Sequence, residues 1–376
     1  MKITALELFH ISIPFAVPYR LSKIYGTLTD AQAVILKLHT DEGLIGFGEA
    51  DPMNPFTEET PGTVMAIMRD LIAPRLMGCD PTAINRIEAR LDQAVLGHPT
   101  ARGAVNMALY DILGKVHGVP VHALLGGKRH DHLPLLGPIG SGSPEEDAAA
   151  IETLIREGYR TVMIKMGALA VGEEIKRMAA AFERFGDRLV LIADANQGWG
   201  LKEALAFVDG VRACTPALIE QPVRHGDLRA LRTIRNAAPC PISADESLVT
   251  VDDAAALLRE DAADAFSIKV SKNGGLSKAL TIAKLAEGFG LRCLMNSMLE
   301  FGITQAASLQ LGCTLDNLLD CGHAYMSVLR MSDDVTDFRE NIADAVVTVP
   351  DRPGLGISIA EDKLKTYTRA HRKIET

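Results

Sequence analysis

Short apolar runs recur at regular intervals through the middle and the end of the chain. Stretches with the periodicity of amphipathic helices, such as 145–157 and 254–261, lie between these runs. Strands that alternate with helices at this spacing predict right-handed parallel βα units. The apolar runs number eight, at 133–136, 161–164, 189–192, 217–219, 241–243, 265–268, 291–294 and 317–319. Eight such units predict an α/β fold, a closed (β/α)8-type barrel rather than an open sheet.

The first part of the chain has a different pattern, in which strands come first and helices follow. Strands are predicted at 2–13, 33–38 and 44–49, and helices at 62–75, 82–96 and 101–117. Residues 18–29 are predicted to form a polar loop between the first two strands. This order indicates a segregated α+β unit. We expect three regions: an N-terminal α+β domain over 1–126, the barrel over 127–330, and a C-terminal segment over 331–376 that returns to the first domain.

Composition and charge exclude several classes of protein. With 47% hydrophobic and 23% charged residues, the 376-residue chain is predicted to be globular and not disordered. Its formal net charge of -9 argues against a nucleic-acid or anionic-membrane partner. The six cysteines form no CxxC pair, which is typical of a reducing compartment, and no apolar run reaches the roughly 18 residues of a membrane helix. Because Glu7, His10 and Pro14 interrupt the N-terminal apolar pattern, a signal peptide is not expected either. These features favour a cytoplasmic enzyme with a small-molecule partner.

One charged residue follows each of five consecutive apolar runs. These residues are Lys165, Asp194, Glu220, Asp245 and Lys269. Because the strands of a barrel all end at the same face, the five side chains are expected to meet at the catalytic face.

Three carboxylates that converge in this way repel one another unless a cation lies among them. Oxygen ligands suit a hard divalent ion, so Asp194, Glu220 and Asp245 are candidate ligands for Mg²⁺, with Mn²⁺ as a substitute. The alternative is that each acid only begins a loop.

Two lysines on opposite sides of such a metal are candidate acid/base residues. Burial and a nearby cation lower the pKa of a lysine, so that Lys165 or Lys269 can remove a proton α to a carboxylate and generate an enediolate. With one lysine on each face, a proton removed from one side can be returned from the other, which inverts the carbon. The alternatives are that a lysine only pairs with a metal-bound acid, that it acts as the nucleophile of a metal-independent Schiff-base lyase, or that the barrel is a non-catalytic scaffold.

The motifs around these residues resemble those of the enolase superfamily, in its muconate lactonizing enzyme subgroup. The resemblance covers nearly the whole chain. It is carried by ADANQGW at 193–199, IEQP at 219–222, ADES at 244–247, IKVSKNGG at 268–275, SMLE at 297–300, GFGEA at 46–50 and LLGG at 124–127.

The resemblance implies the roles of the site residues. Asp194, Glu220 and Asp245 are implied as Mg²⁺ ligands and Lys165 and Lys269 as acid/base residues. The first domain is implied to cap the barrel, and its loops at 18–29 and 51–57 to set specificity. The candidate substrate contacts are Tyr19, Arg20, Ile24, Tyr25, Asn196, Met298, Glu300 and Asp320. The resemblance also implies a homo-oligomer.

Two departures from the family's pattern, and one difference from mandelate racemases, bear on the reaction. Met163 replaces the first lysine of a Lys-x-Lys motif, and Asp320-Cys321-Gly322-His323 keeps half of the Asp-x-Asp motif of dipeptide epimerases. Met298 stands where mandelate racemases place a histidine, which favours the lysine-pair subgroup. Because both lysines are present, the first choice is racemisation or epimerisation of an amino-acid derivative, namely an N-acyl amino acid, a dipeptide or a proline derivative. Muconate-type cycloisomerisation and dehydration of a carboxylate use the same half-reaction and stay open.

Overall fold

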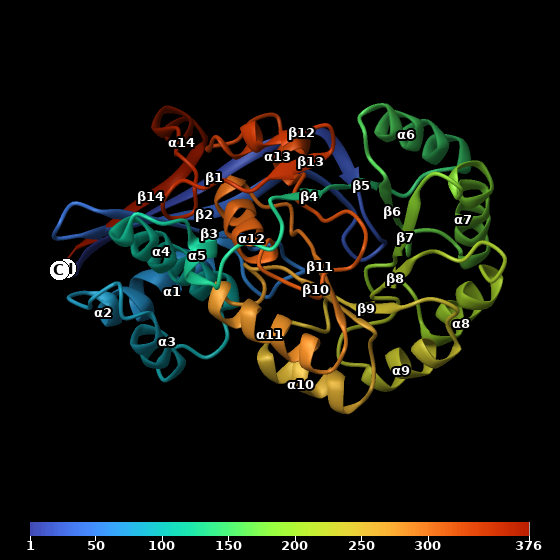
Figure 1. The fold of residues 1–376 in the computed structure, drawn as a ribbon, viewed down its shortest axis with the longest axis horizontal. Helices are drawn as coiled ribbons and strands as arrows, with labels where there is room; N and C mark the ends of the chain where they lie inside the picture. The colour runs from blue at the N-terminus through green and yellow to red at the C-terminus, as the bar shows by residue number, and fades with distance from the viewer. Residues whose placement is uncertain (376) are drawn as a thin grey trace.

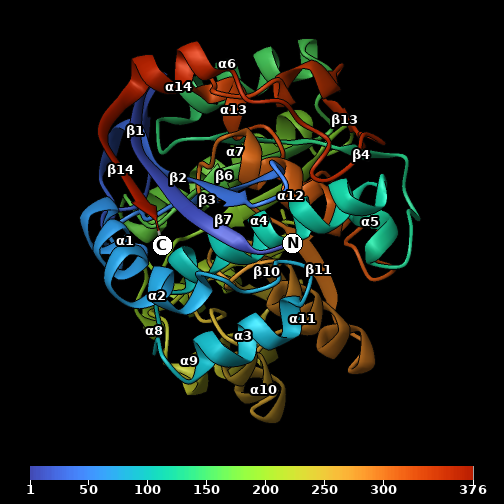
Figure 2. The same cartoon turned by 90° about the vertical axis from the view of Figure 1, so that its left-hand side faces the viewer.

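A computed structural model describes residues 1–375 and places two sheets side by side. The first sheet is antiparallel, with the strand order β14-β1-β2-β3. Its strands are β1 (Ile3–Arg20), β2 (Thr27–Thr40), β3 (Ile45–Ala50) and β14 (Thr368–Glu375). Because β14 pairs with β1, the end of the chain returns to its beginning, and both ends of the chain lie at the same end of the molecule (Figures 1 and 2).

Helices cover the first sheet, and they lie where the periodicity predicts them. They are α1 (Pro61–Ile67), a π-helical turn η1 (Met68–Ile72), α2 (Ala73–Leu76), α3 (Ile84–Asp92), α4 (Pro99–His117) and α5 (Val121–Leu124). Their apolar faces and the inner face of the sheet form a core of their own, which includes Leu36, Val64, Ile87 and Val105.

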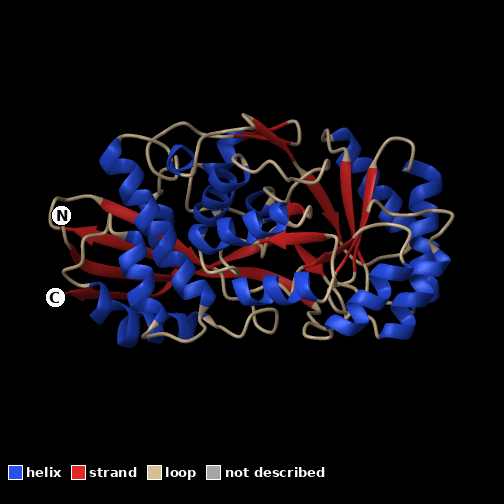
Figure 3. Cartoon of the chain, turned by 60° about the horizontal axis from the view of Figure 1, so that its bottom comes forward, coloured by secondary structure: helices blue, strands red, loops and turns tan. Residues whose placement is uncertain are grey.

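The second sheet is parallel and carries the repeating βα units. Its strands are β5 (Leu136–Ile139), β6 (Thr161–Lys165), β7 (Val190–Asp194), β8 (Leu218–Glu220), β9 (Ile242–Ala244), β10 (Ala265–Ile268) and β11 (Arg292–Met295), in sequential order. The helices that follow them are α6 (Pro144–Arg156), α7 (Val171–Phe185), α8 (Leu201–Gly210), α9 (Leu228–Ala237), α10 (Val251–Arg259), α11 (Leu276–Gly288) and α12 (Gly302–Gly312). The sheet curls, and the helices lie around its outside (Figures 1 and 3).

Short elements complete the chain. They are β4 (His132–Pro134), α13 (Ser327–Arg330), a 3₁₀ turn η2 (Phe338–Asn341), β12 (Ile342–Ala343), β13 (Val346–Thr348) and α14 (Glu361–Tyr367). Strands β12, β13 and β4 form a small antiparallel sheet. No helix within residues 1–375 is both long enough and apolar enough to span a membrane.

The expected eighth barrel strand is not formed, so the predicted eight-stranded barrel is confirmed only as a curled parallel sheet of seven strands. The parallel sheet has seven strands, and residues 317–319 make only a single bridge to β11, between Leu318 and Cys293. The chain then crosses to β5, where the backbone N–H of Leu136 donates to the carbonyl of His323 at 3.0 Å. On the other side, the His323 ring accepts from the backbone N–H of Met295 through Nδ1 at 3.2 Å. A side-chain nitrogen therefore replaces the backbone carbonyl that would accept this hydrogen bond in a regular β-ladder.

We expect acid to destabilise the fold through His323. Burial lowers the pKa of this histidine to about 4, and the charge of His130 adds to the effect. An unfolded histidine titrates near pH 6.5. Because the folded pKa is the lower one, the stabilisation is complete above about pH 6.5 and falls by about 3 kcal/mol as the pH approaches 4. Urea unfolding across this range measures the loss. His323→Gln, which keeps a neutral acceptor, should have a flatter pH dependence, and equal slopes in the two proteins would contradict the assignment.

The first strand differs from its prediction in length. It was predicted at 2–13, but β1 continues to Arg20, and the predicted loop at 18–29 is the end of a long β-hairpin whose turn spans 21–26. Pro14 and Pro18 lack an N–H, and the β1–β2 register shifts between Pro14 and Tyr19. The strand thus continues past this irregularity. Its full length could not be predicted, because proline is unfavourable inside a strand. The hairpin carries its tip to the edge of the parallel sheet.

Close packing fixes the first sheet against helix α4. A Cβ atom on Gly48 would lie 1.9 Å from the Ala104 carbonyl oxygen, and one on Gly46 would lie 2.2 Å from that of Ala108. Only glycine fits at these two positions of β3, because any side chain would overlap the helix backbone. The next residue, Glu49, extends from β3 to the barrel. Its carboxylate accepts from the backbone N–H groups of Phe301 at 2.6 Å and Thr304 at 2.9 Å, at the N-terminus of α12.

Candidate active site

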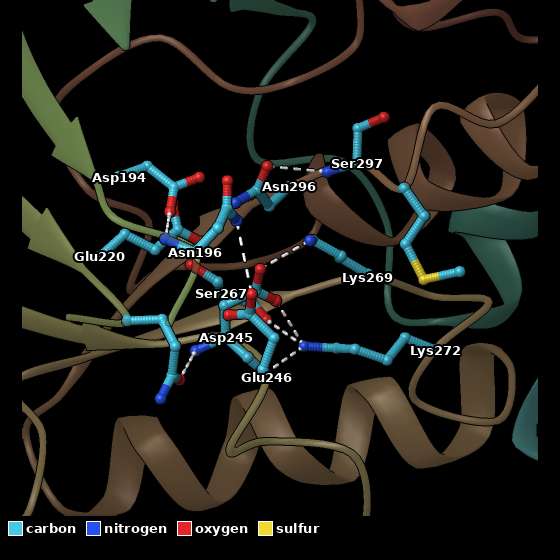
Figure 4. A network of polar contacts seen from close by, with 12 residues as sticks. Asp194, Asn196, Glu220, Asp245, Glu246, Ser267, Lys269, Lys272, Asn296 and Ser297 are labelled. Atoms are coloured by element: carbon cyan, nitrogen blue, oxygen red, sulfur yellow. Dashed lines mark hydrogen bonds and ion pairs between the residues drawn. The ribbon is translucent and has the colours of Figure 1, made fainter. Parts of the chain in front are cut away.

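The five charged residues predicted from the strand ends lie at one edge of the parallel sheet. Lys165 on β6 is the register partner of Asp194 on β7, and Asp194 is the partner of Glu220 on β8. Asp245 and Lys269 come one residue after β9 and β10. Figure 4 shows the acids of this group with Lys269 pointing toward them. The strands that carry the acids lie between those that carry the two lysines.

The lysines hold two of the three carboxylates. Lys165 Nζ pairs with Asp194 Oδ2. Asp245 is bound twice, by Lys269 Nζ through Oδ2 at 2.6 Å and by Lys272 Nζ through Oδ1 at 2.7 Å (Figure 4). Lys272 also donates to the Asp245 backbone carbonyl at 2.6 Å. Asp245 is therefore held in a fixed orientation from two sides.

Glu220 has no lysine partner of this kind. Its Oε1 accepts from Asn296 Nδ2 at 2.6 Å, whereas Oε2 is buried and has no hydrogen-bond partner within the described part of the chain. Burial raises the pKa of Glu220 well above its ordinary value, and the charges of Asp194 and Asp245 raise it further. A buried oxygen without a partner, in a field of negative charge, is a position that favours a cation.

The carboxyl groups around the site have opposite pKa shifts. For Asp245, burial acts to raise the pKa, but the charges of Lys269 and Lys272 outweigh it and lower the pKa to about 2. For Glu246, burial and then the charges of Asp245 and Asp194 raise the pKa to about 8. Burial disfavours the charged form of Lys165, yet Asp194 and the other negative groups outweigh burial and raise its pKa. The pKa of Lys269 is likewise raised, because Asp245, Glu220 and Glu246 outweigh burial. In the protein chain by itself both shifts are thus opposite to the lowered lysine pKa that the sequence predicts.

The carboxylate oxygens of the site are the kind of ligand that a hard divalent ion prefers. Asp194, Glu220 and Asp245 converge from adjacent strands and offer only oxygen atoms, and one oxygen of Glu220 lacks a partner. As the side chains lie, no three His, Cys, Asp or Glu residues within 1–375 form a closed group of metal ligands. The lysines occupy oxygens of Asp194 and Asp245, so a metal would have to share or replace those contacts.

A cavity lies above the strand ends, and both Lys165 and Lys269 line it. Four of the predicted substrate contacts also line it, namely Tyr19, Tyr25, Asn196 and Met298. Tyr25 donates its hydroxyl to Glu246 Oε1 at 3.0 Å and accepts from Gln197 Nε2 at 2.6 Å. The hairpin of the first domain therefore forms one wall of the cavity.

The other predicted contacts lie outside the lining of this cavity. Arg20 is exposed at the end of β1, and Ile24 is 44% exposed in the hairpin turn. Glu300 is buried and organises its own turn, where it accepts from the backbone N–H of Met298 at 2.7 Å and from Gln305 Nε2 at 3.1 Å. Asp320 is exposed, just before the segment that crosses from β11 to β5.

Sequence reasoning did not single out several residues of the site. Asn296 directly follows β11, so the same strand-end rule that found the lysines would have found it. Lys272 and Glu246 stand inside quoted motifs, next to residues that were identified. Met53 and Phe56 line the cavity from the loop at 51–57, which the resemblance implied as a whole without naming either residue.

Comparison with known proteins identifies relatives over the whole chain. Residues 4–126 match the family described as "Mandelate racemase / muconate lactonizing enzyme, N-terminal domain", and residues 146–363 match "Enolase C-terminal domain-like". The chain is 31% identical over 369 residues to the N-succinyl-L-Arg/Lys racemase of Bacillus cereus, covering 98% of each. It is 33% identical over 364 residues to the L-Ala-D/L-Glu epimerase of Bacillus subtilis, covering 95% of this chain and 97% of that one. It is 30% identical over 374 residues to a chloromuconate cycloisomerase of Pseudomonas putida, covering 98% and 100%.

A solved structure confirms the relationship in three dimensions. The crystal structure of N-succinyl Arg/Lys racemase from Bacillus cereus matches with a TM-score of 0.95 at 30% sequence identity, covering 100% of both chains. Together with the strand-end acids and lysines, these matches show that the chain belongs to the mandelate racemase/muconate lactonizing enzyme family of the enolase superfamily.

Proposed function

We propose that the chain is a Mg²⁺-dependent isomerase that removes the proton α to a carboxylate and racemises or epimerises an amino-acid derivative. The observation that carries this proposal is that Lys165 and Lys269 line one cavity from β6 and β10, while the strands between them carry the acids. The names of the relatives, which are racemases, epimerases and cycloisomerases, support this class of reaction.

The two lysines would divide the proton transfer between them. A cation bound to the acids would offset the negative charge that raises the lysine pKa values, so that one lysine could be neutral at Nζ and accept the α-proton from its side of the substrate. The other lysine, an ammonium, would donate a proton to the opposite side. Asp194, Glu220 and Asp245 would hold the metal that the family generally uses. When bound, Mg²⁺ would stabilise the negative charge that develops on the substrate carboxylate. Lys272 and Asn296 would keep Asp245 and Glu220 oriented through the contacts they already make.

Muconate-type cycloisomerisation is the second candidate, because a chloromuconate cycloisomerase is a full-length relative. Proton exchange in D₂O with and without Mg²⁺, followed by NMR and optical rotation, separates the two. Loss of optical rotation with metal-dependent exchange is expected for a racemase, and a lactone product would favour a cycloisomerase. No exchange with N-acyl amino acids, dipeptides, proline derivatives or muconates would contradict the proposal. Substitution by Mn²⁺, a homo-oligomer and a cytoplasmic location remain predictions.

Asp245→Asn is expected to weaken Mg²⁺ binding at least about tenfold, because an amide lacks the charge of a carboxylate ligand. Isothermal titration with MgCl₂ measures this without reference to turnover. Asp252→Asn is the matched control, since Asp252 is exposed on α10, in the next element of the chain. An unchanged Mg²⁺ affinity in Asp245→Asn would remove Asp245 from the proposed site.

A further inference from the structure

We infer that the cavity selects carboxylates with a single negative charge whose remaining part is neutral and apolar, such as an N-acyl derivative of an apolar amino acid. This inference rests on the proposed function and narrows its substrate class. Three observations carry it: the thioether-rich lining, the absence of a further charged partner in that lining, and two buried polar atoms without partners.

The lining is dominated by flexible apolar side chains. Met53, Met163, Met298 and Met326 come from four separate parts of the chain and meet around one cavity. Phe56 adds an aromatic face, 4.3 Å from Lys269 Nζ to the ring centre. Thioethers are polarisable and adopt many rotamers, so they adapt to apolar groups of different shapes. A lining of this kind favours an apolar substituent.

The charged side chains of the lining already form ion pairs. Lys165 and Lys269 are the only charged residues among the described lining residues, and they pair with Asp194 and Asp245. A substrate carboxylate and the proposed metal would complete this charge balance. A second carboxylate would find no further cation in the lining, and an ammonium group would find no acid there. Burying a charge without a partner is strongly unfavourable.

Two charged residues, Arg330 and Glu246, contact residues of the lining from outside the cavity. Arg330 stacks on Tyr19, with its guanidinium carbon 3.8 Å from the ring centre, and donates to the Pro138 carbonyl at 3.1 Å. Glu246 does not line the cavity, and its Oε1 accepts from Tyr25 and Asn196. Glu246 Oε2 and Arg330 Nε are buried without a hydrogen-bond partner among the described residues, but neither residue lines the cavity.

Two buried polar atoms of the lining match a neutral amide. The Tyr19 hydroxyl and Asn196 Oδ1 are both buried and have no hydrogen-bond partner in the structure over residues 1–375. Asn196 Oδ1 is assigned as the oxygen because the amide nitrogen donates to Glu246 at 3.4 Å. An N-acyl group supplies one carbonyl acceptor for the phenol and one N–H donor for the amide oxygen. These are the two partners that the lining lacks.

The test compares substrates that share one amino acid and differ in charge. The full-length protein with Mg²⁺ is assayed with N-acetyl-L-phenylalanine, N-succinyl-L-phenylalanine and L-alanyl-L-phenylalanine, by α-proton exchange in D₂O and by kcat/KM. We expect kcat/KM for the N-acetyl substrate to exceed the other two by at least about 100-fold, since a buried charge without a partner is rejected strongly.

The outcomes separate this inference from the proposed function. Equal or faster exchange of the succinyl substrate or the dipeptide would overturn the inference and leave the proposed function standing. Exchange with none of the three would overturn the inference, and lactonisation of a muconate instead would overturn both the inference and the proposed racemisation. Tyr19→Phe should raise KM for the N-acetyl substrate about tenfold while Mg²⁺ affinity is unchanged. An unchanged KM would overturn the amide recognition.

Discussion

Lys269→Ala is expected to abolish racemisation, with a fall in kcat of about 1000-fold or more, as befits the loss of a general acid/base group. Lys269 Nζ reaches Asp245 from β10, and Lys165 Nζ reaches Asp194 from β6, so each lysine has access to the cavity from its own side. Lys165→Ala should therefore abolish racemisation as well. Each single variant should still exchange the α-proton of one enantiomer, and the two variants should retain opposite enantiomers. Proton NMR in D₂O on each pure enantiomer measures this.

A surface lysine provides the control for this pair. Lys284 lies on α11 with its side chain 56% exposed and pairs with Glu287 on the same helix. Lys284→Ala should keep full activity. If Lys165→Ala and Lys269→Ala both retained full activity, the two-base proposal would be wrong.

Gly48→Ala is expected to prevent the protein from folding, or to lower its free energy of unfolding by about 4 kcal/mol or more. The added methyl carbon would lie 1.9 Å from the Ala104 carbonyl oxygen, and neither β3 nor α4 can move without disturbing the core between them. Soluble expression and circular dichroism during heating measure the effect.

Gly172→Ala is the matched control, because a Cβ at Gly172 in α7 has no neighbour within 4 Å. Alanine there should be tolerated or slightly stabilising. A Gly48→Ala protein that melts at the same temperature as the parent would show that β3 and α4 are not packed as closely as described.

The sequence predicts the charged centre of the site well because the rule behind it is local. Each of Lys165, Asp194, Glu220, Asp245 and Lys269 ends or directly follows a short apolar run, and parallel strands bring their ends to one edge. The pairing of residues 33–38 with 44–49 could also be predicted, because a short turn that contains a glycine joins the two strands.

The missing eighth strand shows where this kind of reasoning fails. Asn317-Leu318-Leu319 has the same apolar pattern as a true strand, but whether it forms one depends on residues that are distant in the sequence. Gly322 passes against the backbone of Leu135, where a Cβ would lie 2.3 Å from the carbonyl oxygen, and His323 binds Met295 through its ring. Such contacts between distant residues leave no periodic trace. The same holds for the cavity lining, because Met53 and Met326 reach it from irregular segments.

The β-hairpin that reaches over the parallel sheet has a consequence for how this enzyme could be altered. Tyr19, Leu21 and Tyr25 lie on or beside its tip, whereas the lysines and acids lie on strands of the other sheet. The tip is closed by its own bond from the Leu21 N–H to the Gly26 carbonyl and contacts the barrel through Ser22 and Asn196. Because the hairpin end and the charged residues belong to different sheets, we expect that the hairpin end can be replaced without changing the strands that carry the lysines and acids. Substrate selectivity would then change separately from the proposed chemistry.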